Sequence, residues 1–333
     1  MKIRGRASRR EFVVAVSAAA ASWPLPVRAQ GSSIPVIGYL YLGAAASRAH
    51  FLDAFRRGLS EMGYVDGRNV MIEYRWAGYE IDRLPELAAE LVAHRVAVIA
   101  TPGSQAATLA AKAATTTIPI VFSVGGDPVY VGLVAQLNRP GGNLTGVAFM
   151  GSEIVTKRLD LLHTLVPHAV RIAFLINPVN PSAALMIEDL KAAASSIGIQ
   201  TEVFYATSNS EIDTAFTNVT QKKADALLVT PDVLFADHRE KIVALAARQS
   251  LPASYGARAF AEAGGLMSYG EDRSESFRQH GVLVGRVLNG EKPADLPVER
   301  SRKFECVINL KTARALGLTV PRVLLAFADQ LID

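Results

Sequence analysis

The sequence predicts an α/β protein made of two lobes of similar build, each with a parallel sheet, which face one another across a cleft. Short β-branched runs alternate with longer stretches of helical periodicity, which is typical of βαβ units and of a parallel sheet covered on both faces. The same alternation starts again in the second half of the chain. At 333 residues, the chain is long enough for more than one compact domain.

The first half begins with an apolar run, PVIGYLYL, and continues with further strand-like runs separated by helical patterns. The predicted strands are 35–42, 69–76, 96–102, 119–125 and 143–150. A helix is predicted over 49–64 because Phe51, Phe55 and Leu59 fall on one face, and another over 83–94 with an apolar stripe of its own.

The second half repeats this pattern and then adds a third set of elements. The predicted strands are 171–178, 200–207, 224–231, 251–257, 264–270 and 303–310. The predicted helices are 182–197, 210–220, 274–288 and 311–316. We expect 31–150 plus about 252–298 to form the N-terminal lobe, and 151–251 plus about 299–333 to form the C-terminal lobe. Several crossings between lobes would make their joint a hinge.

Residues 1–30 have the pattern of an export signal. They hold six Lys/Arg and one acid, followed by a short Ala-rich apolar run and small residues at a cleavage-type site. Arg9-Arg10 followed by Glu11-Phe12 favours the twin-arginine route, with an ordinary Sec signal as the alternative. The sequence therefore predicts a periplasmic protein.

The rest of the chain has a balanced charge and one cysteine. Outside residues 1–30 it holds 29 basic and 30 acidic residues, which gives no basic footprint for nucleic acid. Cys306 lies in the alternating run Phe304–Ile308, so it forms no intramolecular disulfide and is expected to be a small buried hydrophobe.

Short hydrogen-bonding side chains follow the predicted strands, at the edge of a parallel sheet where ligands usually bind. The candidates at these strand ends are Tyr41, Ser104, Gln105, Ser123, Asp127, the loop 177–182 that begins with Asn177, Asp232 and Tyr255. Ser104 is placed either to cap a helix or to join the helix amides in holding a ligand carboxylate. Asp232 is a candidate partner for a ligand ammonium group.

The other candidates have two interpretations each. Asp127 precedes Pro128, so a turn or helix cap is the favoured interpretation. Tyr41 and Tyr255 would either stack on a ligand ring or fill the surface of a lobe.

Catalytic signatures are missing from the sequence. The six histidines show no metal-binding spacing, and neither a phosphate-binding glycine loop nor a nucleophile elbow is present. We therefore expect no enzyme activity, no cofactor and no metal.

Four segments resemble one known family. SYGARAFAEAGGLMSYG, KFECVINLKTARALGLTVP, IPIVFSVGGDPV and VIATPGSQAA are similar to the ABC-transporter substrate-binding proteins of the tryptophan/tyrosine-type uptake family, and the similarity extends from Ile34 to Ile332. The resemblance implies a type I periplasmic binding fold, in which two Rossmann-like α/β lobes joined by three crossings close on a small ligand.

The resemblance also implies partners and a site. It implies delivery of the ligand, an amino acid with an aromatic one favoured, to a membrane permease driven by a separate ATPase. We expect the protein itself to be a monomer. The ligand loops carried over by the resemblance contain Ser104, Gln105, Ser123, Asp127, Asn177 and Asp232, with aromatic contributions near Tyr41 and Tyr255. The chain departs from the family at 124–126 and at Phe235.

Two other classes of protein share parts of this pattern. An exported cofactor-dependent enzyme of two-lobed α/β fold would carry a bound chromophore or metal. The sensor half of a transcription factor would need a helix-turn-helix segment where residues 1–30 have an export signal.

Overall fold

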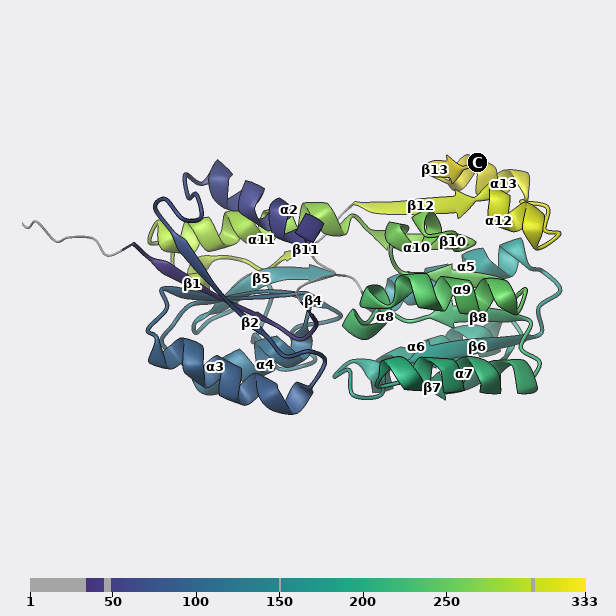
Figure 1. Ribbon diagram of the computed structural model, residues 1–333, viewed down its shortest axis with the longest axis horizontal. Helices are drawn as coiled ribbons and strands as arrows, with labels where there is room; N and C mark the ends of the chain where they lie inside the picture. Colours follow the sequence, from purple (N-terminus) through teal and green to yellow (C-terminus); the bar gives the residue numbers. More distant parts are fainter. Residues whose placement is uncertain (1–33, 45–48, 150, 301–302) are drawn as a thin grey trace, which may run out of the picture. The chain divides into compact units, whose positions relative to one another are not determined.

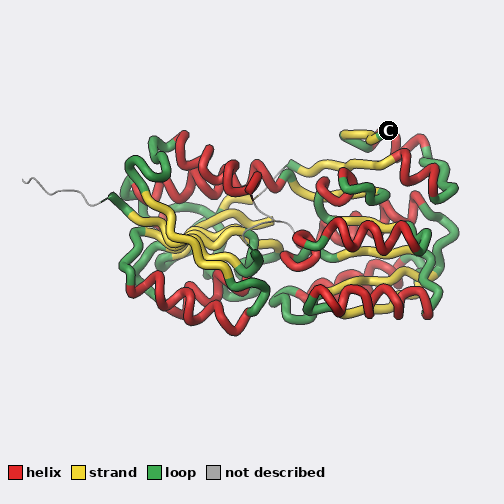
Figure 2. The backbone as a smooth tube through the Cα atoms, viewed as in Figure 1, coloured by secondary structure: helices red, strands yellow, loops and turns green. Residues whose placement is uncertain are grey.

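The computed structural model describes residues 34–44, 49–149, 151–300 and 303–333, and it shows two α/β lobes, each built on its own sheet (Figure 1). Helices flank the strands of both sheets (Figure 2). The predicted fold class, two α/β lobes with mostly parallel sheets, is confirmed. The predicted export signal lies outside the described residues.

The sheet of the first lobe has the strand order β11-β5-β4-β3-β1-β2, and all its pairings are parallel. The strands are β1 (Val36–Tyr41), β2 (Met71–Trp76), β3 (Val98–Pro102), β4 (Ile120–Gly125), β5 (Leu144–Phe149) and β11 (Glu299–Arg300). Strands β1, β3, β4 and β5 are buried along almost their whole length, as expected for a parallel sheet covered on both faces.

Two pairs of helices cover this sheet. Helices α2 (Ala49–Glu61) and α11 (Arg273–Leu288) lie on one face, and α3 (Leu84–Ala93) and α4 (Gln105–Ala114) lie on the other (Figure 1). Helices α2 and α11 approach closely, since a Cβ added to Gly58 would lie 1.9 Å from the carbonyl oxygen of Arg278. Short 3₁₀ turns, η2 (Ile81–Arg83) and η3 (Pro293–Asp295), complete the lobe.

The sheet of the second lobe has the order β13-β12-β10-β9-β8-β6-β7, and only the β10–β12 pairing is antiparallel among the described strands. The strands are β6 (Arg171–Ile176), β7 (Gln200–Tyr205), β8 (Ala226–Val229), β9 (Ala253–Tyr255), β10 (Met267–Glu271), β12 (Phe304–Asn309) and β13 (Gln330–Ile332).

Alternate residues of the central strand β6 enter two separate apolar clusters. Ile172, Phe174 and Ile176 pack with residues of α5 (Gly151–Leu165) and α6 (Ala183–Ser196). Ala173 and Leu175 pack with residues of α7 (Asn209–Gln221), α8 (Val233–Asp237), α9 (Arg239–Arg248) and α10 (Arg258–Glu262). Successive side chains of a strand point to opposite faces, so this all-apolar strand is buried on both. Helices α12 (Leu310–Ala315) and α13 (Arg322–Phe327) follow near the C-terminus.

The expected lobe boundaries are wrong at two places. We assigned about 252–298 to the first lobe, but β9 and β10 pair with each other and with β8 and β12 in the second sheet. We assigned 299–333 to the second lobe, but β11 pairs with β5 in the first sheet. The chain therefore passes between the sheets after β5, between β10 and α11, and after β11.

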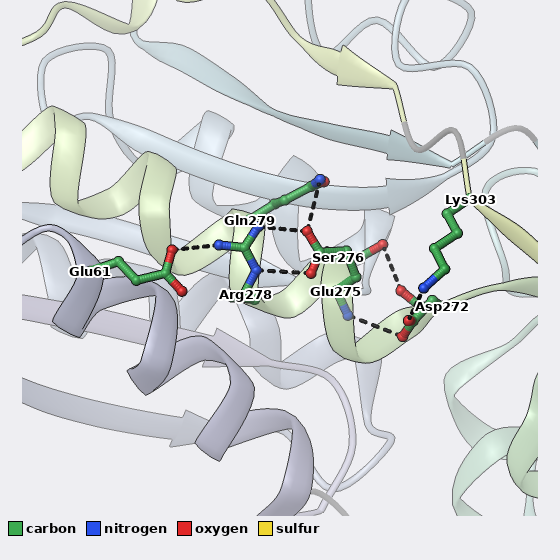
Figure 3. Close-up of polar contacts among 7 residues, drawn as sticks. All are labelled: Glu61, Asp272, Glu275, Ser276, Arg278, Gln279 and Lys303. Atoms are coloured by element: carbon green, nitrogen blue, oxygen red, sulfur yellow. Dashed lines mark hydrogen bonds and ion pairs between the residues drawn. The ribbon is translucent and has the colours of Figure 1, made fainter.

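Two of these passages contact each other at the start of α11 (Figure 3). The backbone N–H of Asp272 donates to the carbonyl of Lys303 at 3.4 Å, and the two side chains form an ion pair at 3.6 Å. Asp272 also caps α11 by accepting a hydrogen bond from the N–H of Glu275 at 3.2 Å. One carboxylate thus anchors both the helix and the adjacent passage.

Arg278 continues this polar chain along α11 toward α2 (Figure 3). Its guanidinium donates to both carboxylate oxygens of Glu275, at 2.8 and 2.6 Å, and it pairs with Glu61 of α2. The segment between β10 and α11 is therefore fixed to the first lobe on one side and to the third passage on the other.

Two further features of the described residues concern the burial of Cys306 and the length of the helices. Cys306 is buried in β12, as expected, and burial raises the pKa of its thiol to about 11. Within the described ranges, none of the helices combines the length and apolar character needed to cross a bilayer.

His280 of α11 makes the stability of the first lobe depend on pH. The side chain is fully buried and lies edge-on to Phe55 of α2, at 5.6 Å between ring centres. Burial lowers the pKa of His280 to about 3, and the backbone of Val121 opposes this only in part. The His280 imidazole is therefore protonated below about pH 6.5 in the unfolded chain, but only below about pH 3 in the folded chain.

The free energy of unfolding should consequently fall with acidification below about pH 6.5, by up to about 1.4 kcal/mol per pH unit from this residue. We expect His280→Leu to flatten the dependence by that amount when urea unfolding is followed by circular dichroism between pH 6.5 and 4.5. Parallel curves for wild type and variant would show that His280 does not remain neutral in the folded protein.

Candidate functional site

A cavity of about 240 Å³ lies between loops of the two lobes, beyond the carboxyl ends of β3, β4, β6 and β8. This is the edge at which ligands bind in open parallel sheets. Its polar and charged lining residues are Ser104, Gln105, Asp127, Asn177, Asn180, Ser182, Asp232, Glu271, Arg273 and Arg300. Five of the eight residues predicted from the sequence, Ser104, Gln105, Asp127, Asn177 and Asp232, are among them.

The loop between β3 and α4 is shaped by capping. Ser104 is the N-cap of α4, and its hydroxyl accepts a hydrogen bond from the N–H of Ala107 at 3.2 Å. Gly103 adopts a φ of +72°, which brings its N–H within 2.9 Å of the Ser123 hydroxyl. Ser123 is fully buried behind this loop and is not part of the cavity lining. It therefore positions the loop that carries Ser104.

The Gln105 side chain spans from one lobe to the other. Its Nε2 donates to the carbonyl of Gly125 at 2.6 Å, at the end of β4. Its Oε1 accepts a hydrogen bond from the Ser182 hydroxyl at 2.9 Å, at the start of α6. Both ends of the amide are engaged, so the side chain holds the two loops together. Gln105 also lines the cavity, and its contact with a ligand carboxylate stays a prediction.

Gly126 leaves the space in which this contact forms. A Cβ at this position would lie 2.9 Å from the Ser182 hydroxyl and 3.1 Å from Nε2 of Gln105, and the residue has a φ of +99°. A side chain here would meet both partners of the hydrogen bond.

A second contact between the lobes involves Tyr79 and Asp237. The Tyr79 hydroxyl, in the loop after β2, donates to Asp237 at the end of α8 at 2.8 Å. Its ring also lies 5.5 Å from that of His238, measured between centres. The lobes are therefore joined by hydrogen bonds at two separate loops.

Asp232 is a buried carboxylate held by three donors. Nδ2 of Asn177 donates to Oδ1 at 3.0 Å, Nδ2 of Asn180 donates to Oδ2 at 2.9 Å, and the N–H of Leu234 donates to Oδ1 at 2.9 Å. The residue is 8 % exposed and lines the cavity. Burial raises the pKa of Asp232, and the three hydrogen bonds and the charge of Arg273 oppose that shift.

This cluster is continuous with the contact between the lobes. Asn180, which holds Asp232, also accepts a hydrogen bond from the N–H of Ser182 at 3.0 Å through its Oδ1. Ser182 in turn donates to Gln105. One chain of hydrogen bonds thus runs from Asp232 in the second lobe to the end of β4 in the first.

Asp127 forms a turn, which was the favoured interpretation of its position before Pro128. Its Oδ1 accepts hydrogen bonds from the N–H groups of Val129 and Tyr130, at 2.7 and 3.3 Å. The side chain is exposed on the cavity lining, so a contact with a ligand stays a prediction.

Tyr41 and Tyr255 lie in the cores of their lobes and do not line the cavity. Each is 1 % exposed. The ring of Tyr41 packs edge-on against Trp76 at 5.7 Å, and that of Tyr255 stacks on Phe260 at 4.7 Å, between ring centres. Both tyrosines therefore pack within their lobes, which is one of the two interpretations that the sequence leaves open.

Several lining residues were missed by the sequence analysis. Asn180 and Ser182 lie in the predicted loop 177–182, but only Asn177 was selected from it. Arg273 follows the end of β10, and its position on the cavity depends on the passage between sheets that we placed wrongly. The apolar part of the lining includes Leu137, Phe149, Ile154, Leu185 and Met186.

Metal binding has no support within the described residues, since they contain no group of three or more His, Cys, Asp or Glu side chains placed to hold an ion. The cavity instead carries charges of both signs beside an apolar surface, an arrangement suited to a small zwitterion.

Known proteins similar to this chain bind small ligands. The Tyrosine-binding protein of Clostridioides difficile (strain R20291) is 28 % identical over 267 residues, which cover 79 % of this chain and 75 % of the relative. A solved ABC domain in complex with L-Trp from Streptococcus pneumonia is 29 % identical, with a TM-score of 0.82 over 90 % of this chain and 100 % of that one.

A ligand-free, open substrate binding protein from Clostridium difficile is 25 % identical, with a TM-score of 0.62 over 90 % of this chain and 99 % of that one. A model of the family described as ABC transporter substrate binding protein matches residues 44–332. The two-lobed fold, the cavity at the facing loops and this match together show that the chain belongs to the family of ABC transporter substrate-binding proteins.

Proposed function

We propose that this protein is the periplasmic solute-binding component of an ABC importer and that it binds an amino acid, with an aromatic one favoured, in the cavity between its lobes. The observation that carries the proposal is the buried Asp232 carboxylate, held by two asparagines on the lining of a cavity that also has a large apolar surface.

Asp232 is suited to accept the ligand ammonium group. The carboxylate is buried, and its side-chain hydrogen-bond donors are neutral amides. Its negative charge is therefore removed from water without a hydrogen-bonded cation to compensate for the lost hydration. An ammonium group would supply a charge-assisted hydrogen bond at this position. Asn177 and Asn180 fix the carboxylate in place before the ligand arrives.

The ligand carboxylate has partners in the first lobe and at its border. Ser104 caps α4 by accepting a hydrogen bond, which leaves its hydroxyl proton to be donated, and the positive end of the α4 dipole lies at the same loop. Arg273 lines the cavity and adds a positive charge. Gln105 contributes through its backbone, because its side chain joins the lobes.

The apolar part of the lining favours a large side chain on the ligand. Phe149, Leu185 and Met186 offer one aromatic and two flexible aliphatic surfaces to it. The relatives described as binding tyrosine and L-Trp support this choice.

Location and partners follow from the sequence and the family. The export-type segment at residues 1–30 supports a periplasmic location. Membership of the family supports delivery of the ligand to a permease with its separate ATPase. We propose that the protein acts as a monomer.

Binding without turnover is the first test. Protein that has been unfolded, stripped of ligand and refolded should gain thermal stability with L-tryptophan or L-tyrosine, by about 2.7 kcal/mol at a ligand concentration of 100 times Kd. The ligand should be recovered unchanged by mass spectrometry. No shift in melting temperature with any of the twenty amino acids would contradict the proposed ligand class.

Asp232→Asn tests the ammonium assignment. We expect the variant to weaken L-tryptophan by on the order of a hundredfold, because the ammonium loses a buried charged partner. Indole-3-propionate, which lacks the amine, should lose far less affinity in calorimetry. Asp160→Asn is the matched control and should leave both affinities unchanged, since it neutralises an exposed carboxylate of the same lobe that is not part of the cavity lining. An equal loss for both ligands in Asp232→Asn would refute the assignment.

Gln105→Ala and Ser182→Ala test whether the hydrogen bond between the lobes supports the ligand-bound state. Each should raise the ligand dissociation rate several-fold, in line with the loss of about 1 kcal/mol from one hydrogen bond. The double variant should lose little more than either single variant, because both remove the same contact. Stopped-flow fluorescence measures these rates, and additive losses would show that the two residues act separately.

A further inference from the structure

Arg158, on α5, is a buried cation that the site described so far does not use. Its side chain is fully buried, and its Nη2 donates to the carbonyls of Val229 and Ser254, the latter at 3.5 Å. Its Nε and Nη1 atoms have no hydrogen-bond partner, and no ion pair joins it to an acid in the described ranges. A buried charge without a counter-charge is costly, so such a residue needs an explanation.

The unpaired side of Arg158 lies against one wall of the cavity. A Cβ built on Gly256 would lie 2.9 Å from Nη1 of Arg158 and 3.3 Å from Pro231, and both Gly256 and Pro231 line the cavity. One residue without a side chain therefore separates the guanidinium from the space for the ligand.

The neighbouring strand keeps this wall thin. Gly270, at β10, also lines the cavity, and a Cβ there would lie 2.1 Å from the carbonyl oxygen of Gly256. Larger residues at either position would move the wall and place more atoms between cavity and cation. The two glycines and the arginine thus form one arrangement contributed by β9, β10 and α5.

We propose that Arg158 is a positioning residue that favours a carboxylate ligand, by supplying its charge through the thin wall at Gly256. A ligand carboxylate that reaches past Asp232 toward this wall would provide the counter-charge that the hydrogen-bonded surroundings of the guanidinium lack. Electrostatic interactions across a few ångströms of protein are much stronger than in water, so direct contact is not required. This inference rests on the proposed function, because it assigns a partner to the carboxylate of the same ligand.

Burial lowers the pKa of Arg158 to about 9, and no neighbouring charge contributes to that shift. The side chain therefore stays cationic near neutral pH. A nearby anion such as the ligand carboxylate would raise the pKa of Arg158 again. The attraction that strengthens binding of the anion also stabilises the protonated guanidinium.

The competing explanation is a brace, in which Arg158 only ties the ends of β8 and β9 together through the two carbonyls. Three variants separate the explanations. Arg158→Lys keeps the charge, Arg158→Gln keeps hydrogen-bond donors without the charge, and Arg158→Met keeps neither. If Arg158 acts through its charge, Arg158→Gln and Arg158→Met should weaken ligand binding to the same extent. If Arg158 is only a brace, Arg158→Gln should bind the ligand as the wild type does.

Calorimetry with L-tryptophan and L-tryptophanamide reads out the charge, because the amide keeps the ammonium group and lacks the carboxylate. We expect Arg158→Gln and Arg158→Met to weaken L-tryptophan by about tenfold or more and the amide by less than about twofold, with Arg158→Lys close to wild type. Equal weakening of the two ligands in the Gln variant overturns the proposal.

The melting temperature of the ligand-free protein is the second readout. Replacing an unpaired buried charge by an apolar side chain should leave the melting temperature unchanged or raise it, whereas loss of a brace should lower it. If wild-type protein binds neither L-tryptophan nor L-tyrosine, the proposed ligand class fails and this readout alone decides. A melting temperature that falls in Arg158→Met and keeps its wild-type value in Arg158→Gln shows a brace and overturns the role of Arg158, whereas an unchanged or higher value in both variants supports an uncompensated buried charge at this wall.

Discussion

The hydrogen bond from Ser182 to Gln105 connects the parts of this structure that matter for binding. On one side it reaches the end of β4 through Gln105, and on the other it reaches Asp232 through Asn180. Gly126 leaves the room in which it forms, since a Cβ there would lie 2.9 Å from the Ser182 hydroxyl. If the ligand contacts Asp232 as proposed, it also orients this contact between the lobes, and binding and closure would then involve the same groups.

Two buried charged groups, Asp232 and Arg158, lie at or behind the cavity wall, and the rest of the lining includes apolar side chains whose burial by a ligand would be favourable. Asp232 and Arg158 are both withdrawn from water, and neither has an oppositely charged residue hydrogen-bonded to it among the described residues. Under the proposed function, a zwitterion would bring an ammonium group to Asp232, which otherwise feels only the more distant charge of Arg273, and its side chain would cover the apolar lining. Under the proposed function, charges that weaken the empty protein would be the features that select the ligand.

The sequence predicted the elements well and their partners less well. Strands such as β1 and β6 are long apolar runs flanked by helical periodicity, so their existence and the parallel sheets follow from local pattern. Strand β9 is three residues long and fully buried, and nothing in such a run says which sheet it joins. The wrong lobe boundaries, and the omission of Arg273 from the predicted site, both come from that ambiguity.

In the candidate site too, residues selected by their position after a strand could be predicted, whereas roles that depend on partners distant in the sequence could not. Position after a strand was enough to select Ser104 and Asp232, because the carboxyl ends of parallel strands meet at one edge. It was not enough for Gln105, whose role depends on a partner 77 residues away, or for Arg158, whose partner carbonyls lie 71 and 96 residues away. Long-range contacts of this kind set which charges line the cavity, so under the proposed function the identity of the ligand depends on the packing of the lobes more than on any one motif.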